Sequence, residues 1–124
     1  MFHIKLPGYL PPGLNGSKGL MRMHWGTKHK MSTEVINKIT STFHDTLPNF
    51  RGPVRVTYLR KSTRLMDWDN ACASFKLVGD ALVNLCVIED DSPDIIQDFI
   101  PLQERVKTRK EHGIEITIEP IPQG

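Results

Sequence analysis

The order of apolar patterns along the sequence predicts an α+β fold, with a small mixed β-sheet and two main helices. The prediction rests on two observations, the positions of the alternating segments and the helical segments between them. Segments of alternating apolar and polar residues lie near both ends of the chain and at its centre, and segments with helical periodicity lie between them. The length of 124 residues allows one domain with a substantial core but is too small for two. We therefore expect residues 1–124 to form a single domain.

The first half should contain a strand, a loop and a helix. Apolar alternation over residues 2–6 predicts a strand with one buried face. Residues 7–32 are rich in glycine and proline and have almost no periodicity, so we expect a long functional loop there. A helix should follow, capped by Ser32 or Thr33 and running to about Leu47, just ahead of a proline.

The second half should contain another helix between strands. Alternation over residues 54–59 predicts a second strand, and residues 69–85 show a helical pattern. Strand-like stretches follow within residues 94–106, and isoleucines alternate over residues 114–118 as a final strand. On a helical wheel the apolar residues gather on one side, which marks the buried face of the second helix: Ala71, Phe75, Val78, Leu82 and Leu85.

Charge is distributed unevenly along the chain. Residues 1–66 carry eleven lysines and arginines against two acids, a net charge of +9. Residues 67–100 carry eight acids against one lysine, a net charge of −7. A cationic surface beside an acidic centre favours a polyanionic partner such as nucleic acid. An evenly solvated surface is the alternative that charge alone leaves open.

The acidic centre has the composition of a divalent-metal site. Asp67 and Asp69 lie at a predicted strand-to-helix junction, Lys76 lies on the polar side of the helix, and Asp90 and Asp91 lie in the turn after it. Clustered carboxylates repel one another and need a cation, and hard oxygen ligands suit Mg²⁺ or Mn²⁺. We expect three or four carboxylates to meet there and to serve phosphodiester hydrolysis, with the lysine at the phosphate. Helix capping and turn formation are the structural alternative.

The two cysteines and the hydropathy of the chain bear on its compartment. Cys72 and Cys86 would lie about 21 Å apart on one helix, which is too far for a disulfide. We expect buried free thiols in a reducing compartment, and hence a cytoplasmic protein. No apolar run reaches the roughly 20 residues of a membrane span, and the chain does not open on a signal-peptide pattern.

The acidic motif carries a family resemblance. The string Asp67-Trp68-Asp69-Asn70, then Lys76, Asp80-Ala81-Leu82 and Glu89-Asp90-Asp91-Ser92, resembles the RusA family of Holliday-junction resolvases. Leu6-Pro7 and Pro11-Pro12 with Asn15 are similar to that family's N-terminal strand and loop. The resemblance implies a RusA-like homodimer, encoded by a bacterium or a phage, that cuts four-way DNA junctions by paired symmetric nicks with Mg²⁺ or Mn²⁺.

The resemblance also implies roles for individual residues. Asp67, Asp69 and Asp91 would be the catalytic metal ligands, with Asp90 adjacent, and Lys76 would be the catalytic lysine. The basic first half and the matching loop together give the residues expected to bind DNA: Asn15, Lys18, Arg22, Lys28, Lys30, Arg60, Lys61 and Arg64. A flexible arm or a dimer contact is the alternative for the loop. Cleavage of flaps or forks, or junction binding without cleavage, are the alternatives for the function.

One feature departs from the family pattern. The family lysine follows the second aspartate of the motif by four residues, and Ala73 stands at that position here. Lys76 instead keeps the family's spacing to Asp80, as if three residues followed Asn70 as an insertion. Three residues are nearly one helical turn, so Lys76 should stay on the same side of the helix, about 4.5 Å further along its axis. Asp80 is expected to pair with Lys76 as an i,i+4 neighbour.

Overall fold

The computed structural model describes residues 1–13, 25–43 and 46–122 of the chain. Within this part the protein has an α+β fold with a mixed four-stranded sheet, as the sequence predicts. The elements in chain order are β1 (Phe2–Pro7), α1 (Trp25–Thr42), β2 (Val54–Ser62), α2 (Trp68–Ala73), α3 (Lys76–Asn84), β3 (Ile96–Arg105), the short 3₁₀ turn η2 (Arg109–Glu111) and β4 (Gly113–Pro120).

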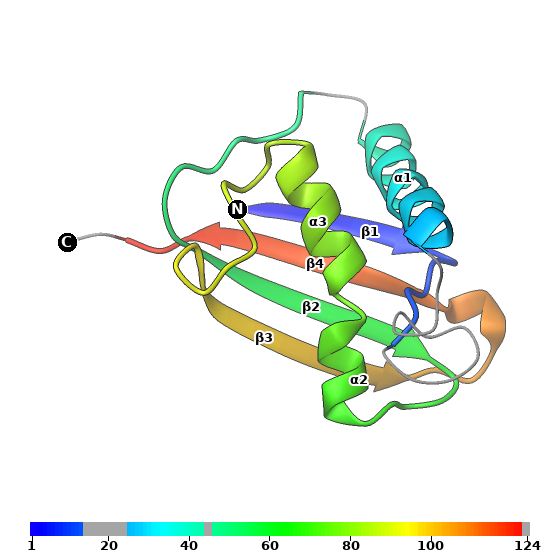
Figure 1. Cartoon of the computed structure of the whole chain (residues 1–124). Coiled ribbons are helices and arrows are strands. Elements are labelled where there is room, and N and C mark those ends of the chain that lie inside the picture. Colours follow the sequence, from blue (N-terminus) through cyan, green and yellow to red (C-terminus); the bar gives the residue numbers. More distant parts are fainter. Residues whose placement is uncertain (14–24, 44–45, 123–124) are drawn as a thin grey trace.

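The sheet has the strand order β1-β4-β2-β3. β4 lies antiparallel to both β1 and β2, whereas β2 and β3 are parallel, so their connection crosses over through α2 and α3. The helices lie on one face of the sheet (Figure 1). Alternate side chains of β1, β2 and β4 point to that face and form the core with the helices, and β3 adds Ile96. The alternation predicted for β1, β2 and β4 is therefore confirmed.

Helix α1 differs from the predicted helix at both ends. It begins at Trp25, so the last residues of the predicted loop are helical, and it ends at Thr42 rather than Leu47. Neither Ser32 nor Thr33 is a cap, because both lie inside the helix, where the Thr33 hydroxyl donates to the His29 carbonyl at 3.0 Å. The early end follows from a run of hydroxyl residues of low helix propensity, of which Thr40 donates to the Ile36 carbonyl.

The predicted second helix is divided into α2 and α3. Ser74 is buried between them, and its hydroxyl donates to the Ala71 carbonyl at 2.6 Å. The Tyr58 hydroxyl of β2 lies 2.7 Å from the same oxygen, which fixes the junction to the sheet. The Phe75 amide then bonds to the Cys72 carbonyl, three residues back, so the backbone tightens into a 3₁₀ turn. Both helices still present the predicted apolar side to the core, although Leu85 is only half-buried.

The cysteines only partly match the prediction. Both thiols are free, but Cys72 is half-buried and Cys86 is exposed, so the expectation of two buried thiols was wrong. Cys86 has a φ of 60° in the turn that ends α3, and this places its side chain outside the core. In the described part of the chain, none of the helices has the length and apolarity needed to cross a membrane.

Candidate active site

The first pair of acids lies at the start of α2, on a segment that is tied to β3. The Met66 amide donates to the Gln103 Oε1 at 2.8 Å, and the Gln103 Nε2 donates back to the Met66 carbonyl at 2.9 Å. Asp67 follows with an extended backbone and is the residue before the first helical turn. Asp69 lies in that turn. The two bonds to Gln103 therefore hold the entry to the acidic motif against the edge strand of the sheet.

The carboxylates of Asp67 and Asp69 do not cap helix α2. The Asp67 side chain makes no capping hydrogen bond to the described backbone. The Asp69 Oδ1 accepts a bond of 3.1 Å from the next amide, that of Asn70, which is not the Ncap pattern. Both side chains are exposed, so their oxygen atoms face solvent beside α2.

The second pair of acids lies in the turn between α3 and β3. The Asp90 Oδ1 accepts a bond of 2.9 Å from the Asp91 amide. The Ser92 hydroxyl and this amide hold the pKa of Asp90 below its ordinary value. This is the turn chemistry that sequence reasoning left open as an alternative for Asp90. The Asp91 side chain is different, because it points to α3 and is 28% exposed.

A glycine of α3 allows this approach. A Cβ atom at Gly79 would lie 3.2 Å from the Phe75 ring and 3.5 Å from the Asp91 Cβ, so a larger residue would crowd both. Sequence reasoning missed Gly79. A glycine inside a helical pattern is itself a signal of close approach, and it was available in the sequence.

Lys76 joins the turn to α3. Its Nζ lies 3.1 Å from the Asp80 Oδ1 and 3.3 Å from the Asp91 Oδ2. The hydrogen bond to Asp80 is the main cause that raises the pKa of Lys76, and Asp91 adds to it. The i,i+4 pair expected from the sequence is therefore present. The structure also brings Lys76 to Asp91, fifteen residues further along the chain.

The four acids of the motif do not converge in the way expected from the sequence. Among the described residues, no three acid, histidine or cysteine side chains are grouped closely enough to hold a metal ion. The centre that forms is instead one ammonium between two carboxylates, those of Asp80 and Asp91. Mutual repulsion explains this, because carboxylates gather only around a cation, and the cation here is Lys76. The four aspartates of the motif all offer oxygen, which is the ligand atom that a hard divalent ion prefers.

The residues expected to bind DNA are scattered in the structure. Asn15, Lys18 and Arg22 lie outside the described residues, as does the side chain of Lys28, whose backbone is in α1. Lys30 is exposed on α1, and Arg64 is exposed in the segment after β2. Arg60 and Lys61, at the end of β2, have other partners.

Arg60 is 7% exposed and points to the helix side of the sheet. Its guanidinium donates to the Pro11 carbonyl at 3.2 Å and to the Met66 sulfur at 3.1 Å, and burial lowers its pKa. Arg60 thus ties the segment after β1 to the segment before α2. It does not present its charge to a surface ligand in this structure, contrary to the expected role.

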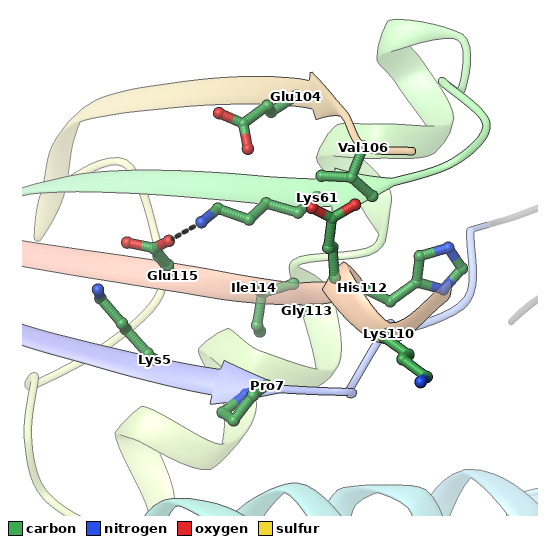
Figure 2. Close-up of a pocket in the computed structure, with 11 residues that line it drawn as sticks. Lys5, Pro7, Lys61, Glu104, Val106, Lys110, His112, Gly113, Ile114 and Glu115 are labelled. Carbon is green, nitrogen blue, oxygen red and sulfur yellow. Dashed lines mark ion pairs between the residues drawn. The ribbon is translucent and has the colours of Figure 1, made fainter. Parts of the chain in front are cut away.

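Lys61 lies on the opposite face of the sheet, beside a cavity of about 340 Å³ (Figure 2). Its ammonium is 2.5 Å from a Glu115 oxygen, and this bond raises the pKa of Lys61. Lys5 and Lys110 also line the cavity, but Glu104, Glu111 and Glu115 line it with them. The cavity is therefore mixed in charge rather than cationic.

A second cavity of about 360 Å³ opens beside Lys76 and Asp91. It lies between α2, the start of α3, the turn at Pro93 and strand β3. Its walls are mainly apolar, and sequence reasoning missed it because its residues come from four separate segments: Cys72, Ala73, Phe75, Lys76, Asp91, Pro93, Ile96 and Phe99.

The candidate residues thus form two separate sets: exposed acids at the start of α2, and a lysine between two carboxylates with an apolar cavity beside it. The lysine is the group of this set that can pair with a phosphate, because carboxylates repel an anion unless a cation lies between them. No protein-family model matches this sequence, and no curated protein matches it either.

Proposed function

We propose that the protein is a metal-dependent endodeoxyribonuclease of the RusA type, which resolves four-way DNA junctions by paired nicks. The observation that carries this proposal is the contact of 3.3 Å between Lys76 and Asp91. The two residues are distant in sequence, and both belong to the motif that resembles the resolvase family. Their contact supports the assignment of both to one centre, and Asp67 and Asp69 lie at the start of the adjacent helix α2.

The residues that would hold the metal are Asp67, Asp69 and Asp91, with Asp90 adjacent. Mg²⁺ or Mn²⁺, when bound there, would supply Lewis acidity and an activated water for phosphodiester hydrolysis. Asp91 is available for this role because its carboxylate is only partly buried and its sole described ion pair is with Lys76. The carboxylates of Asp67 and Asp69 are exposed and make no capping bond, so they too are free to turn toward a cation.

Lys76 would bind the phosphate of the strand that is cut. In the structure its ammonium is shared by Asp80 and Asp91, and an ammonium has three donors in all. The third donor can therefore reach a phosphate oxygen while Asp80 keeps the side chain in place. A positive charge at this position stabilises the extra negative charge that develops as the phosphodiester is attacked.

The partners in this proposal are branched DNA and a second copy of the chain. A two-fold dimer presents two identical centres, which suits paired nicks on opposite strands of a junction. Lys28, Lys30 and Arg64 are the residues that would contact the DNA backbone, and a cytoplasmic location fits this substrate. Arg60 is left out of the contact set because it is buried.

The test is cleavage of end-labelled synthetic DNA by the purified protein, with Mg²⁺ or with EDTA. We expect Mg²⁺-dependent, symmetric nicks in a four-way junction and slow cleavage of linear duplex. Cleavage of flaps or forks but not of four-way junctions would show that the substrate is another kind of branched DNA. A bandshift without cleavage in Mg²⁺ or Mn²⁺ would identify a junction-binding protein and overturn the proposed activity.

A further inference from the structure

The cavity beside Lys76 has the shape and composition of a ligand site. Its volume of about 360 Å³ lies at the lower end of the range for small-molecule pockets, which are mostly apolar with a few placed polar groups. Here the polar groups are the ammonium of Lys76 and the carboxylate of Asp91, at the same edge of the cavity. The remaining walls come from aromatic, aliphatic and small side chains.

The aromatic wall of the cavity is firmly supported. The rings of Phe75 and Phe99 lie with their centroids 5.0 Å apart, at an angle of 42°. Tyr58 packs behind both rings, and its hydroxyl is fixed by Ser74. Phe75 is buried, but Phe99 is only half-buried, so part of its ring surface is open to a ligand. Planar aromatic ligands stack well on such a surface.

We propose that this cavity holds one unstacked nucleobase of the DNA strand, next to the phosphate that Lys76 contacts. The proposal builds on the proposed function and adds a base-binding site to it. Lys76 and Asp91 belong both to the candidate centre and to the cavity wall, so a nucleotide whose phosphate lies at Lys76 has its base beside the cavity. An apolar cavity disfavours the phosphate itself, which must stay at the charged edge.

The chemistry of a base matches the cavity in two ways. Its flat face stacks on an aromatic ring, as in proteins that bind single-stranded or extruded bases. Its edge carries amino groups, and the Asp91 carboxylate, which accepts from Lys76, has further lone pairs to accept from one of them. Unstacking costs least where a base has already lost part of its stacking, and a branch point is such a place. The cavity would thus help to select branched over linear DNA.

Two variants test this site without opening the core. Ala73→Leu fills the cavity from α2 with a residue of good helix propensity. Phe99→Leu keeps an apolar side chain but removes the ring. Leu102→Ala is the matched control, because Leu102 lies on the same strand and is exposed away from the cavity. Circular dichroism and thermal unfolding check that each variant folds.

The readout is the affinity for a four-way junction in EDTA, where no cleavage occurs. Single abasic sites are placed in turn at the nucleotides nearest the branch. At one position we expect the abasic site to weaken binding by the wild type and by Leu102→Ala by roughly 5-fold to 150-fold, the range typical of base–aromatic stacking. Ala73→Leu should weaken binding to the intact junction by a similar factor, and the abasic site should add nothing further.

The result that overturns the proposal is additivity. If Ala73→Leu and every abasic site act independently, or if Ala73→Leu binds as tightly as the wild type, the cavity holds no base. A change in dimerisation alone on filling the cavity would likewise overturn it and assign the cavity to a second copy of the chain. Because binding is measured without metal, this outcome is separate from the nuclease assay. If the effects of Ala73→Leu and the abasic site on binding do not add, but the protein cuts no DNA, the nuclease activity is ruled out and the base-binding site stands.

Discussion

Replacement of Lys76 by alanine separates a catalytic lysine from a surface ion pair. The side chain is 62% exposed, and its two partners are 44% and 28% exposed, so the two ion pairs together contribute about 1 kcal/mol to folding. Alanine is also the better helix former. The free energy of unfolding should therefore change by less than about 1 kcal/mol, a shift of a few degrees in Tm.

The effect on cleavage should be much larger. Removing a positioned cation from a phosphoryl-transfer site costs on the order of 2–4 kcal/mol in the barrier, or roughly 30-fold to nearly 1,000-fold in rate. Single-turnover cleavage of a labelled junction gives this rate, and thermal unfolding of the same preparation gives the stability. A rate within two-fold of the wild type would refute the role, because Lys76 would then only pair with Asp80 and Asp91. The double variant Ala73→Lys, Lys76→Ala shows whether a cation one turn nearer Asp69 restores the rate.

The same pair gives a pH dependence of stability. Asp80 raises the pKa of Lys76 in the folded state above its ordinary value of 10.5. The stabilisation is therefore complete at neutral pH, and it disappears as the pH rises from 10.5 through the folded-state pKa. Unfolding by urea at a series of pH values, for the wild type and Lys76→Met, measures it. A difference between the two proteins that grows with pH above 10.5 would contradict the assignment.

Three further predictions concern residues outside the pairing of Lys76. Asp69→Asn should abolish nicking while junction binding survives, because the change removes the charge of a metal ligand but no attraction to phosphate. Nicking at the wild-type rate would show that Asp69 is not catalytic. Neutralising Lys28 and Lys30 together should lower the slope of log K against log salt by roughly one to two units, and an unchanged slope would place the DNA surface elsewhere. Gln103→Leu removes two part-buried hydrogen bonds to the segment before Asp67, and it should lower the free energy of unfolding, measured with urea, by about 1–3 kcal/mol. A change near zero would show that those bonds do not hold the segment.

The strands were predictable because each has one buried face. Buried and more exposed side chains alternate along β1 and β2, and along β4 from Ile114 onward, and a single period of two explains it. The helix ends were not predictable in this way. The sequence predicts a cap at Ser32 or Thr33, but hydroxyl side chains also bond backward within a helix, as Thr33 does, and the sequence does not say which bond forms. The division at Ser74 depends on Tyr58 of β2, which is a tertiary contact.

The candidate site shows the same division between local and tertiary information. The pairing of Lys76 with Asp80 follows from helix geometry and was predicted. The meeting with Asp91 depends on how the turn folds back, and Gly79 makes room for it. Arg60 was predicted to face DNA on the strength of its charge. The predicted strand ended at residue 59, but β2 continues to Ser62, and the same alternation places Arg60 on the buried side with Val54, Val56 and Tyr58.

We propose that one centre, which includes Asp91, cuts junction DNA with a divalent metal. The most direct measurement compares three proteins for single-turnover cleavage of a labelled four-way junction in Mg²⁺: the wild type, Asp91→Asn and Asp94→Asn. Asp94 is an exposed acid of the same turn with no described ion pair, so it is the matched control for charge. We predict symmetric nicks by the wild type and by Asp94→Asn, and loss of cleavage with retained binding for Asp91→Asn. Absence of cleavage by the wild type, or equal rates for all three proteins, would contradict the claim.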